Sequence, residues 1–368
     1  MSSMEICGLI EQTILREDPD AHVDKVPVAD GGEGFVDAYL TMCGGRKYEK
    51  LVSGPLFEPV RAYWGMLTDD CTAVIEMSAA AGLELLTPEQ RNPGNTTTLG
   101  VGELIIDAVE KGARKIILGL GGSATNDGGI GMAYALGYRF LDEAGQELPP
   151  VGFSLARIHH IEAPAGKRIT DTVIIEAACD VDNPLYGSNG AAHIYGPQKG
   201  ADADMAARLD AGLVNLAVRL SEDMGIDISR IPGGGAAGGL GAGAVAFLDA
   251  KLHSGIDLLL DAVNFDEMVR HADYCFTGEG RIDGQSLSGK TPVGVARRAQ
   301  KYHVPVIGIA GSLGRDIDSL YDAGFTTVIS TIRSLNTLEE TLKSCREDLC
   351  AAVRSVIRLI VTMEQHKS

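Results

Sequence analysis

Residues 119–129 carry the densest set of groups that could bind a phosphate or a small hydroxy acid. Five glycines free the backbone there, and Ser123, Thr125, Asn126 and Asp127 add two hydroxyls, an amide and a carboxylate. The segment lies between a predicted strand and a predicted helix, where flexible backbone and short polar groups can wrap an anion. A purely structural loop seldom needs all of these groups, so we interpret it as a functional loop.

Other segments place carboxylates after predicted strands. Residues 179–187 contain Asp180, Asp182 and an amide, which are hard oxygen ligands of the kind that magnesium takes. The alternative for this segment is a turn held by side-chain hydrogen bonds to the backbone. Residues 28–34 contain glycines next to Asp30 and a glutamate, and here the alternative is an acidic tight turn.

Residues 284–291 match the Gly-x-x-x-x-Gly-Lys-Thr pattern of a phosphate-binding P-loop. We expect the preceding strand to end near Thr277, so that residues 278–283 intervene, whereas a P-loop follows its strand directly. Pro292 also follows at once, which suits the first turn of a helix but not that loop. We therefore reject the P-loop. We interpret residues 278–283 as a strand-end loop, placed before a helix whose free amides attract anions.

The elements that must position these groups alternate between strand and helix. Apolar runs predict strands at 23–29, 60–66, 73–77, 115–120, 173–178, 274–277, 304–310 and 326–330. Helical periodicity appears at 98–111, 205–224 and 292–302, and capping boxes predict that helices begin after Ser2 and after Thr337. Apolar strands joined by helices indicate a parallel, doubly wound sheet. The glycine-rich residues 231–243 are expected to be a close-packing or hinge segment.

The composition excludes several classes of protein. With 368 residues, 45% of them apolar, the chain is long enough for two domains. Its net charge of −18 disfavours binding to nucleic acid and to anionic membranes. Seven scattered cysteines form no Cys-x-x-Cys pair, so we expect neither disulfides nor zinc, and a cytoplasmic location. We see no leader and no apolar run of the ~18 residues that a membrane span needs, so we expect a soluble protein.

Together these motifs resemble the type I glycerate kinases, the bacterial glycerate 2-kinases. In chain order they are residues 26–34, 121–129, 179–184, and 277–281 with 289–292, and the resemblance covers nearly the whole chain. It implies an α/β fold with a discontinuous, flavodoxin-like domain that contains a doubly wound parallel sheet, built from residues 1–52 and 268–368. A large inserted α/β domain, residues 53–267, is implied between them.

The resemblance also implies an activity. These enzymes use ATP and Mg²⁺ to phosphorylate D-glycerate, usually to 2-phosphoglycerate, in the breakdown of glyoxylate, glucarate or galactarate. We expect a small-molecule substrate, no nucleic-acid or membrane partner, and a monomer or a homodimer. Two alternatives stay open, namely a kinase for another small hydroxy acid and a catalytically impaired ligand-binding protein.

The roles of the site residues are hypotheses. Asp180 and Asp182 hold magnesium or orient the glycerate hydroxyl. Asp180, Asp127 and Asp30 are the candidates for the base, and the sequence does not rank them. Arg281 is assigned to the glycerate carboxylate, because its planar fork matches that group. The other assigned substrate contacts are Glu279, Asn126 and Ser123, and the assigned ATP contacts are Gly121, Gly122, Thr125, Gly278 and Lys290.

The N-terminus departs from the family pattern. Members begin with a short strand and a loop of the form Ala-Pro-Asp-Ser-Phe-Lys-Gly-Ser, whereas Met1, Ser2 and Ser3 correspond only to the end of that loop. We therefore expect the given sequence to lack this strand and the Asp, Ser and Lys of the loop. Binding or turnover by this form is expected to be weakened.

Overall fold

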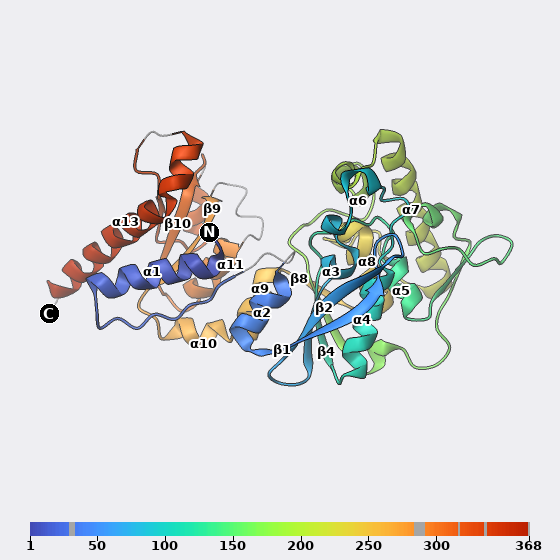
Figure 1. Ribbon diagram of the computed structural model, residues 1–368, viewed down its shortest axis with the longest axis horizontal. Coiled ribbons are helices and arrows are strands. Elements are labelled where there is room, and N and C mark those ends of the chain that lie inside the picture. The colour runs from blue at the N-terminus through green and yellow to red at the C-terminus, as the bar shows by residue number, and fades with distance from the viewer. Residues whose placement is uncertain (29–33, 283–290, 316, 335–336, 367–368) are drawn as a thin grey trace. The chain divides into compact units, whose positions relative to one another are not determined.

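The structure is a computed structural model, and it describes residues 1–28, 34–282, 291–315, 317–334 and 337–366 (Figure 1). The chain divides into two compact units. Met1–Val28 and Leu259–Ser368 form the smaller unit, and Ala29–Leu258 forms the larger one. Within the described residues, no helix is long and apolar enough to cross a membrane.

The larger unit is built on a six-stranded sheet with the order β1-β2-β3-β4-β7-β8. Its strands are β1 (Gly45–Ser53), β2 (Pro59–Leu67), β3 (Thr72–Glu76), β4 (Lys115–Gly119), β7 (Ile174–Ala178) and β8 (Lys251–His253). The pairs β1–β2 and β2–β3 are antiparallel, whereas β3, β4, β7 and β8 run parallel. The carboxyl ends of these four strands therefore lie along one edge of the sheet, which is where open α/β sheets bind ligands.

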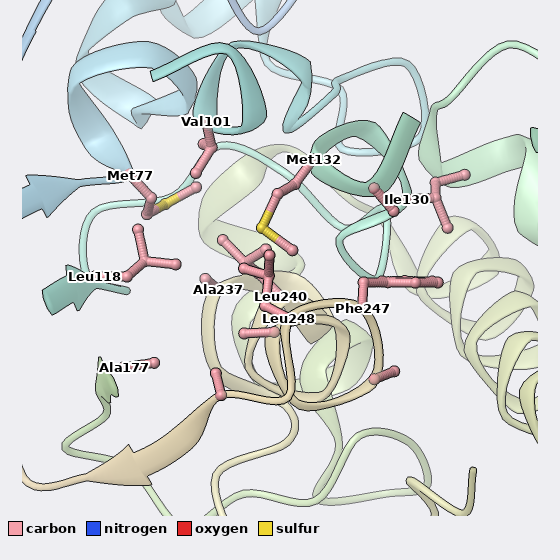
Figure 2. Packing of buried hydrophobic residues seen from close by; sticks show 14 of the residues in the cluster. Met77, Val101, Leu118, Ile130, Met132, Ala177, Ala237, Leu240, Phe247 and Leu248 are labelled. Atoms are coloured by element: carbon pink, nitrogen blue, oxygen red, sulfur yellow. The ribbon is translucent and has the colours of Figure 1, made fainter. Parts of the chain in front are cut away.

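Helices and a two-stranded β5–β6 sheet complete the larger unit. They are α2 (Phe35–Cys43), α3 (Ser78–Ala81), α4 (Leu99–Glu110), α5 (Ile130–Ala135), β5 (Arg139–Leu141), β6 (His160–Glu162), α6 (Ala191–Tyr195), α7 (Ala203–Met224) and α8 (Ala236–Leu248), with short 3₁₀ turns between them. Figure 2 shows how their apolar side chains meet, with Met132 of α5 directed toward Leu240 of α8. Both residues are fully buried in one continuous core.

The glycine-rich segment packs closely, as predicted. At Gly238 the backbone has φ +70°, and a Cβ atom there would lie 1.9 Å from the carbonyl oxygen of Thr125. The Gly238 carbonyl also accepts a hydrogen bond from the N–H of Gly128 at 3.1 Å. The start of α8 therefore lies directly against residues 119–129.

The smaller unit contains a three-stranded parallel sheet with the order β11-β10-β9. Its elements are α1 (Ser3–Glu17), α10 (Phe265–Arg270), β9 (Cys275–Ile282), α11 (Thr291–Gln300), β10 (Val306–Leu313), α12 (Asp318–Asp322), β11 (Thr327–Ser330) and α13 (Leu338–Gln365); α9 (Gly255–Ala262) spans the boundary between the units. Capping boxes open α1 and α13, as predicted. Figure 1 shows α1 beside α13, and Ile14 and Val353 of these helices share a buried cluster with Ile307 and Ile309 of β10.

Strand predictions near two of the motifs were wrong. Residues 18–28 contain no strand, and Val23 instead packs at the side of the α1–α13 cluster. Strand β9 does not end at Thr277 but continues to Ile282, which pairs with Leu313 of β10. The glycines that suggested a loop permit the pairing, since a Cβ at Gly278 would lie 1.9 Å from the Ile309 carbonyl oxygen.

The longer strand also removes one argument against the P-loop. Only residue 283 separates the end of β9 from Gly284, so the predicted interval of several residues is wrong. Helix α11 begins at Thr291 and carries Pro292 in its first turn, as expected. Residues 283–290 themselves, with Lys290, lie outside the described residues.

The compact units differ from the predicted domain limits at 52/53 and 267/268. The reason is local pairing: β1 pairs with β2 along its whole length, and the N–H of Val36 in α2 donates to the Glu76 carboxylate of β3 at 3.2 Å. These contacts join residues 34–52 to the six-stranded sheet. The predicted domain limits stay a prediction.

Candidate active site

The loops after β4 and β7 lie next to each other at the carboxyl edge of the six-stranded sheet. Gly119 at the end of β4 pairs with Ala178 at the end of β7, and the N–H of Leu120 donates to the Ala178 carbonyl at 3.3 Å. The structure therefore brings together two of the predicted segments, residues 119–129 and 179–187.

Asp127 ties the first of these loops to its neighbours. The carboxylate is fully buried and accepts hydrogen bonds from the N–H and hydroxyl of Thr98 at 2.7 and 2.8 Å, and from the N–H groups of Gly129 and Gly131 at 3.1 and 3.2 Å. Burial raises the pKa of the Asp127 carboxyl, and these four donors act in the opposite direction. The bonds connect the loop to the starts of α4 and α5.

Polar atoms without a protein partner lie just before Asp127. Thr125 and Asn126 are fully buried, and the Thr125 hydroxyl and both amide atoms of Asn126 have no hydrogen-bond partner among the described residues. Buried polar groups are nearly always paired, because an unpaired one costs about 1 to 3 kcal/mol. Gly122, with φ +75°, is exposed in the same loop, and a Cβ atom there would lie 3.0 Å from the Cβ of Ser78. The adjacent Gly121 is half-buried.

Ser123 has a partner that the sequence did not reveal. The side chain of Lys199, only 2% exposed, donates from Nζ to the Ser123 hydroxyl oxygen at 2.7 Å and to the Thr125 carbonyl at 2.8 Å. Burial lowers the pKa of Lys199 from 10.5 to about 7, whereas the charge of Asp127 acts to raise it. The lysine lies in a Pro-Gln-Lys-Gly turn, a pattern that normally indicates the surface.

Glu76 is a second residue at this edge that sequence reasoning missed. It is 2% exposed at the end of β3 and accepts a hydrogen bond from the Tyr63 hydroxyl at 2.7 Å, besides the one from Val36. This carboxylate fixes the start of α2. Its place at the end of an apolar strand is a signal that could have identified it.

The Asp180 carboxylate, which follows β7, bonds to the start of α9. Asp180 is exposed, and its Oδ1 accepts the N–H of Gly255 at 2.8 Å and the Ser254 hydroxyl at 3.3 Å, so that it caps the start of α9. The amide of Asn183 bonds locally, donating to the Asn189 carbonyl. Asp182 is exposed. In the part of the chain that the structure describes, no group of three or more His, Cys, Asp or Glu side chains is arranged to hold a metal.

The remaining predicted residues belong to the smaller unit or lie outside the described residues. Glu279 and Arg281 are on strand β9, opposite Ala310 and Ser312 of β10. Side chains two apart in a strand share a face, so Glu279 and Arg281 lie on one face and Gly278 on the other. Asp30 and Lys290 are in the segments that the structure does not describe.

Comparison with known proteins assigns the whole chain, rather than any one site, to a family. The model of the glycerate kinase family matches residues 1–361. The chain belongs to this family. It is 46% identical to the glycerate 2-kinase of Escherichia coli K12 over 357 residues, which cover 97% of this chain and 93% of that protein. It is also 46% identical to the glycerate kinase of Bacillus subtilis 168 over 366 residues, covering 99% and 96%.

A solved structure in the glycerate kinase family has the same fold. The crystal structure of a putative glycerate kinase 2 from Salmonella typhimurium LT2 superposes with a TM-score of 0.86 at 42% identity, covering 99% of this chain and 96% of that one. The predicted fold class, α/β with sheets rich in parallel pairs, is thereby confirmed.

Proposed function

We propose that this chain transfers the terminal phosphate of ATP to D-glycerate, at the 2-hydroxyl. Membership of the glycerate kinase family supports a kinase with this substrate. The structural observation that carries the proposal is the loop after β4, where the buried Thr125 hydroxyl and Asn126 amide have no hydrogen-bond partner in the part of the chain that the structure describes. Such groups are suited to the oxygen atoms of phosphate and of a hydroxy acid.

The reaction requires positioning and charge neutralisation more than covalent catalysis by the protein. The glycerate hydroxyl oxygen forms a bond to the terminal phosphorus, the bond to the bridging oxygen breaks, ADP leaves, and the hydroxyl proton passes to a carboxylate. Asp180, Asp127 and Asp30 remain the candidates for that carboxylate. Among the first two, exposure favours Asp180, because four protein donors already surround the buried Asp127.

The contacts with glycerate and ATP are assigned to the loop after β4, to strand β9 and to Lys290. Ser123, Asn126 and Glu279 are each proposed as contacts of glycerate, and Arg281 is proposed to pair with its carboxylate. The ATP phosphates are assigned to Gly121, Gly122, Thr125, Gly278 and Lys290. Backbone N–H groups of these glycines and the charge of Lys290 are proposed to neutralise phosphate charge in a chain whose net charge is −18.

Asp180 and Asp182 are the residues that would hold Mg²⁺. Magnesium in phosphoryl-transfer sites is usually bound by one or two carboxylates together with substrate phosphates, so the donor set after β7 fits this ion. The ion would neutralise charge on the transferred phosphate.

The net charge of −18 and the unpaired cysteines favour a cytoplasmic location. We also propose that the protein is a monomer or a homodimer.

The test is an ADP-release assay with D-glycerate, L-glycerate, lactate and tartronate as acceptors, followed by phosphorus NMR of the product. We expect turnover with D-glycerate and a 2-phosphoglycerate signal. A 3-phosphoglycerate signal would overturn the choice of hydroxyl. Turnover only with another acceptor would identify a different hydroxy-acid kinase, and thermal stabilisation by glycerate without turnover would identify a binding protein.

A further inference from the structure

Lys199 is a buried lysine that none of the predicted roles uses. Its side chain lies within the larger unit, 2% exposed, at the end of the 3₁₀ turn Pro197–Lys199. Placing a lysine in a protein interior is costly unless its hydrogen-bond donors are satisfied. Because of this cost, we expect Lys199 to have a role that requires its N–H donors, which an apolar side chain of the same length lacks.

The turn holds the lysine in a fixed position. Gly200 has φ +97°, and a Cβ atom there would lie 2.3 Å from the Arg91 carbonyl oxygen, so the turn packs directly against the backbone of residue 91. The N–H of Lys199 donates to the Gly196 carbonyl at 2.9 Å. The side chain of Lys199 therefore extends from a closely packed, hydrogen-bonded turn.

Both acceptors of the lysine are on the loop after β4. The Nζ atom bonds to the Ser123 hydroxyl oxygen at 2.7 Å and to the Thr125 carbonyl at 2.8 Å. These two residues flank Ala124 and precede Asn126, whose amide has no hydrogen-bond partner within the described ranges of the chain. A neutral amine has two N–H donors and an ammonium has three, so the two bonds are available in either protonation state.

We propose that Lys199 is a positioning residue, which holds residues 123–126 so that the Thr125 hydroxyl and the Asn126 amide are preset for substrate oxygens. The inference rests on the proposed function of this loop. Lys199 holds Ser123 and Thr125 through its two hydrogen bonds, while the Thr125 hydroxyl and the Asn126 amide next to these acceptors bind the substrates. A preset loop lowers the barrier because the polar groups do not have to reorganise during phosphoryl transfer.

The first experiment compares Lys199→Met with wild type at a temperature where circular dichroism shows both to be folded. Methionine keeps the length of the stem and removes the donors. We expect kcat with D-glycerate to fall about tenfold or more, and the backbone amides of residues 121–126 to exchange hydrogen faster while those of β4 are unchanged. The matched control Trp64→Phe removes another buried hydrogen bond, to Asp107 at 2.9 Å, and should lower Tm without lowering kcat.

A second variant keeps the lysine and moves its turn. Gly200→Ala forces a Cβ toward the Arg91 carbonyl, whereas Gly225→Ala, at φ +71° with nothing within 4 Å, is a control for backbone strain alone. We expect Gly200→Ala, and not Gly225→Ala, to lower kcat and speed exchange in the loop. The proposal would be overturned if Lys199→Met left both kcat and the hydrogen exchange of the loop unchanged. If Lys199→Met does not fold, the same result in Gly200→Ala would overturn it. If wild type itself does not turn over glycerate, the proposed function fails, and the exchange measurement still decides whether Lys199 holds the loop.

Discussion

The Oδ1 atom of Asp180 accepts the backbone N–H of Gly255 at 2.8 Å, so the carboxylate that follows β7 also begins helix α9. Anionic groups are stabilised at helix N-termini, and the hydrogen bond from Gly255 fixes the position of this carboxylate. A residue proposed for metal binding or proton transfer is therefore also a helix cap.

Asp180→Asn is expected to separate these two roles. Asparagine caps helices about as well as aspartate, so Tm should change little, whereas kcat should fall about a hundredfold because the negative charge is lost. Steady-state kinetics and thermal unfolding measure both quantities. Ser254→Ala, which removes only the longer 3.3 Å bond to Asp180, is the control and should retain most activity. Near-normal turnover in Asp180→Asn would exclude Asp180 from the mechanism.

Asp127→Asn is expected to act mainly on stability. The amide NH₂ of asparagine would meet protein N–H donors in a fully buried position, so the free energy of unfolding should fall by about 3 kcal/mol or more. Urea unfolding measures this. Asp69→Asn is a matched control, because Asp69 also accepts hydrogen bonds from Cys71 and Thr72 but is exposed, and solvent can replace the lost contacts. A stable but inactive Asp127→Asn would instead indicate a direct part in the chemistry.

Lys199 should make stability depend on pH in the alkaline range. Burial lowers the folded-state pKa to about 7 from 10.5, so between these values the unfolded chain binds more protons than the folded one. The free energy of unfolding of wild type should therefore rise with pH relative to Lys199→Met, by at most about 1.4 kcal/mol per pH unit. Urea unfolding of both proteins from pH 6 to pH 10 tests this range, in which other titrating groups are common to both. A difference that stays constant with pH would contradict the prediction.

Arg281→Lys is expected to weaken glycerate binding. The substitution keeps the charge but removes the fork that can pair with a carboxylate through two hydrogen bonds, so KM for glycerate should rise about tenfold. Arg281 is exposed on β9, and Tm should change little. Arg270→Lys, at an exposed arginine of α10, is the control. An unchanged KM would remove Arg281 from the substrate contacts.

The sequence predicted the buried strands well and the exposed ones poorly. Apolar runs located β2, β3, β4 and β7, but the edge strand β1 was missed, because its mostly exposed side chains include Arg46, Lys47 and Lys50 and form no apolar run. Strand β9 was cut short because glycine normally indicates a loop. Only pairing with β10 reveals that Gly278 serves close backbone approach.

For the candidate site, residue types pointed to the loop after β4 but not to Lys199, which donates two hydrogen bonds to that loop. Ser123, Thr125 and Asn126 are close to one another in the sequence, and their chemistry can be recognised there. Lys199 is more than seventy residues away from Ser123, in a turn whose composition predicts exposure. Its role depends on tertiary packing, which local patterns do not encode.

The contact between Gly238 and the Thr125 carbonyl has a consequence for how this enzyme can vary. A side chain at position 238 would displace the loop by its own volume, since a Cβ would lie 1.9 Å from that oxygen. If residues 119–129 bind the substrates, as we propose, a change in substrate range and a change in the packing of α8 would have to occur together. A laboratory selection for new hydroxy-acid acceptors would have to find compensating changes in α8 and the loop at once, and single-site libraries of the loop alone would sample only part of the accessible specificity.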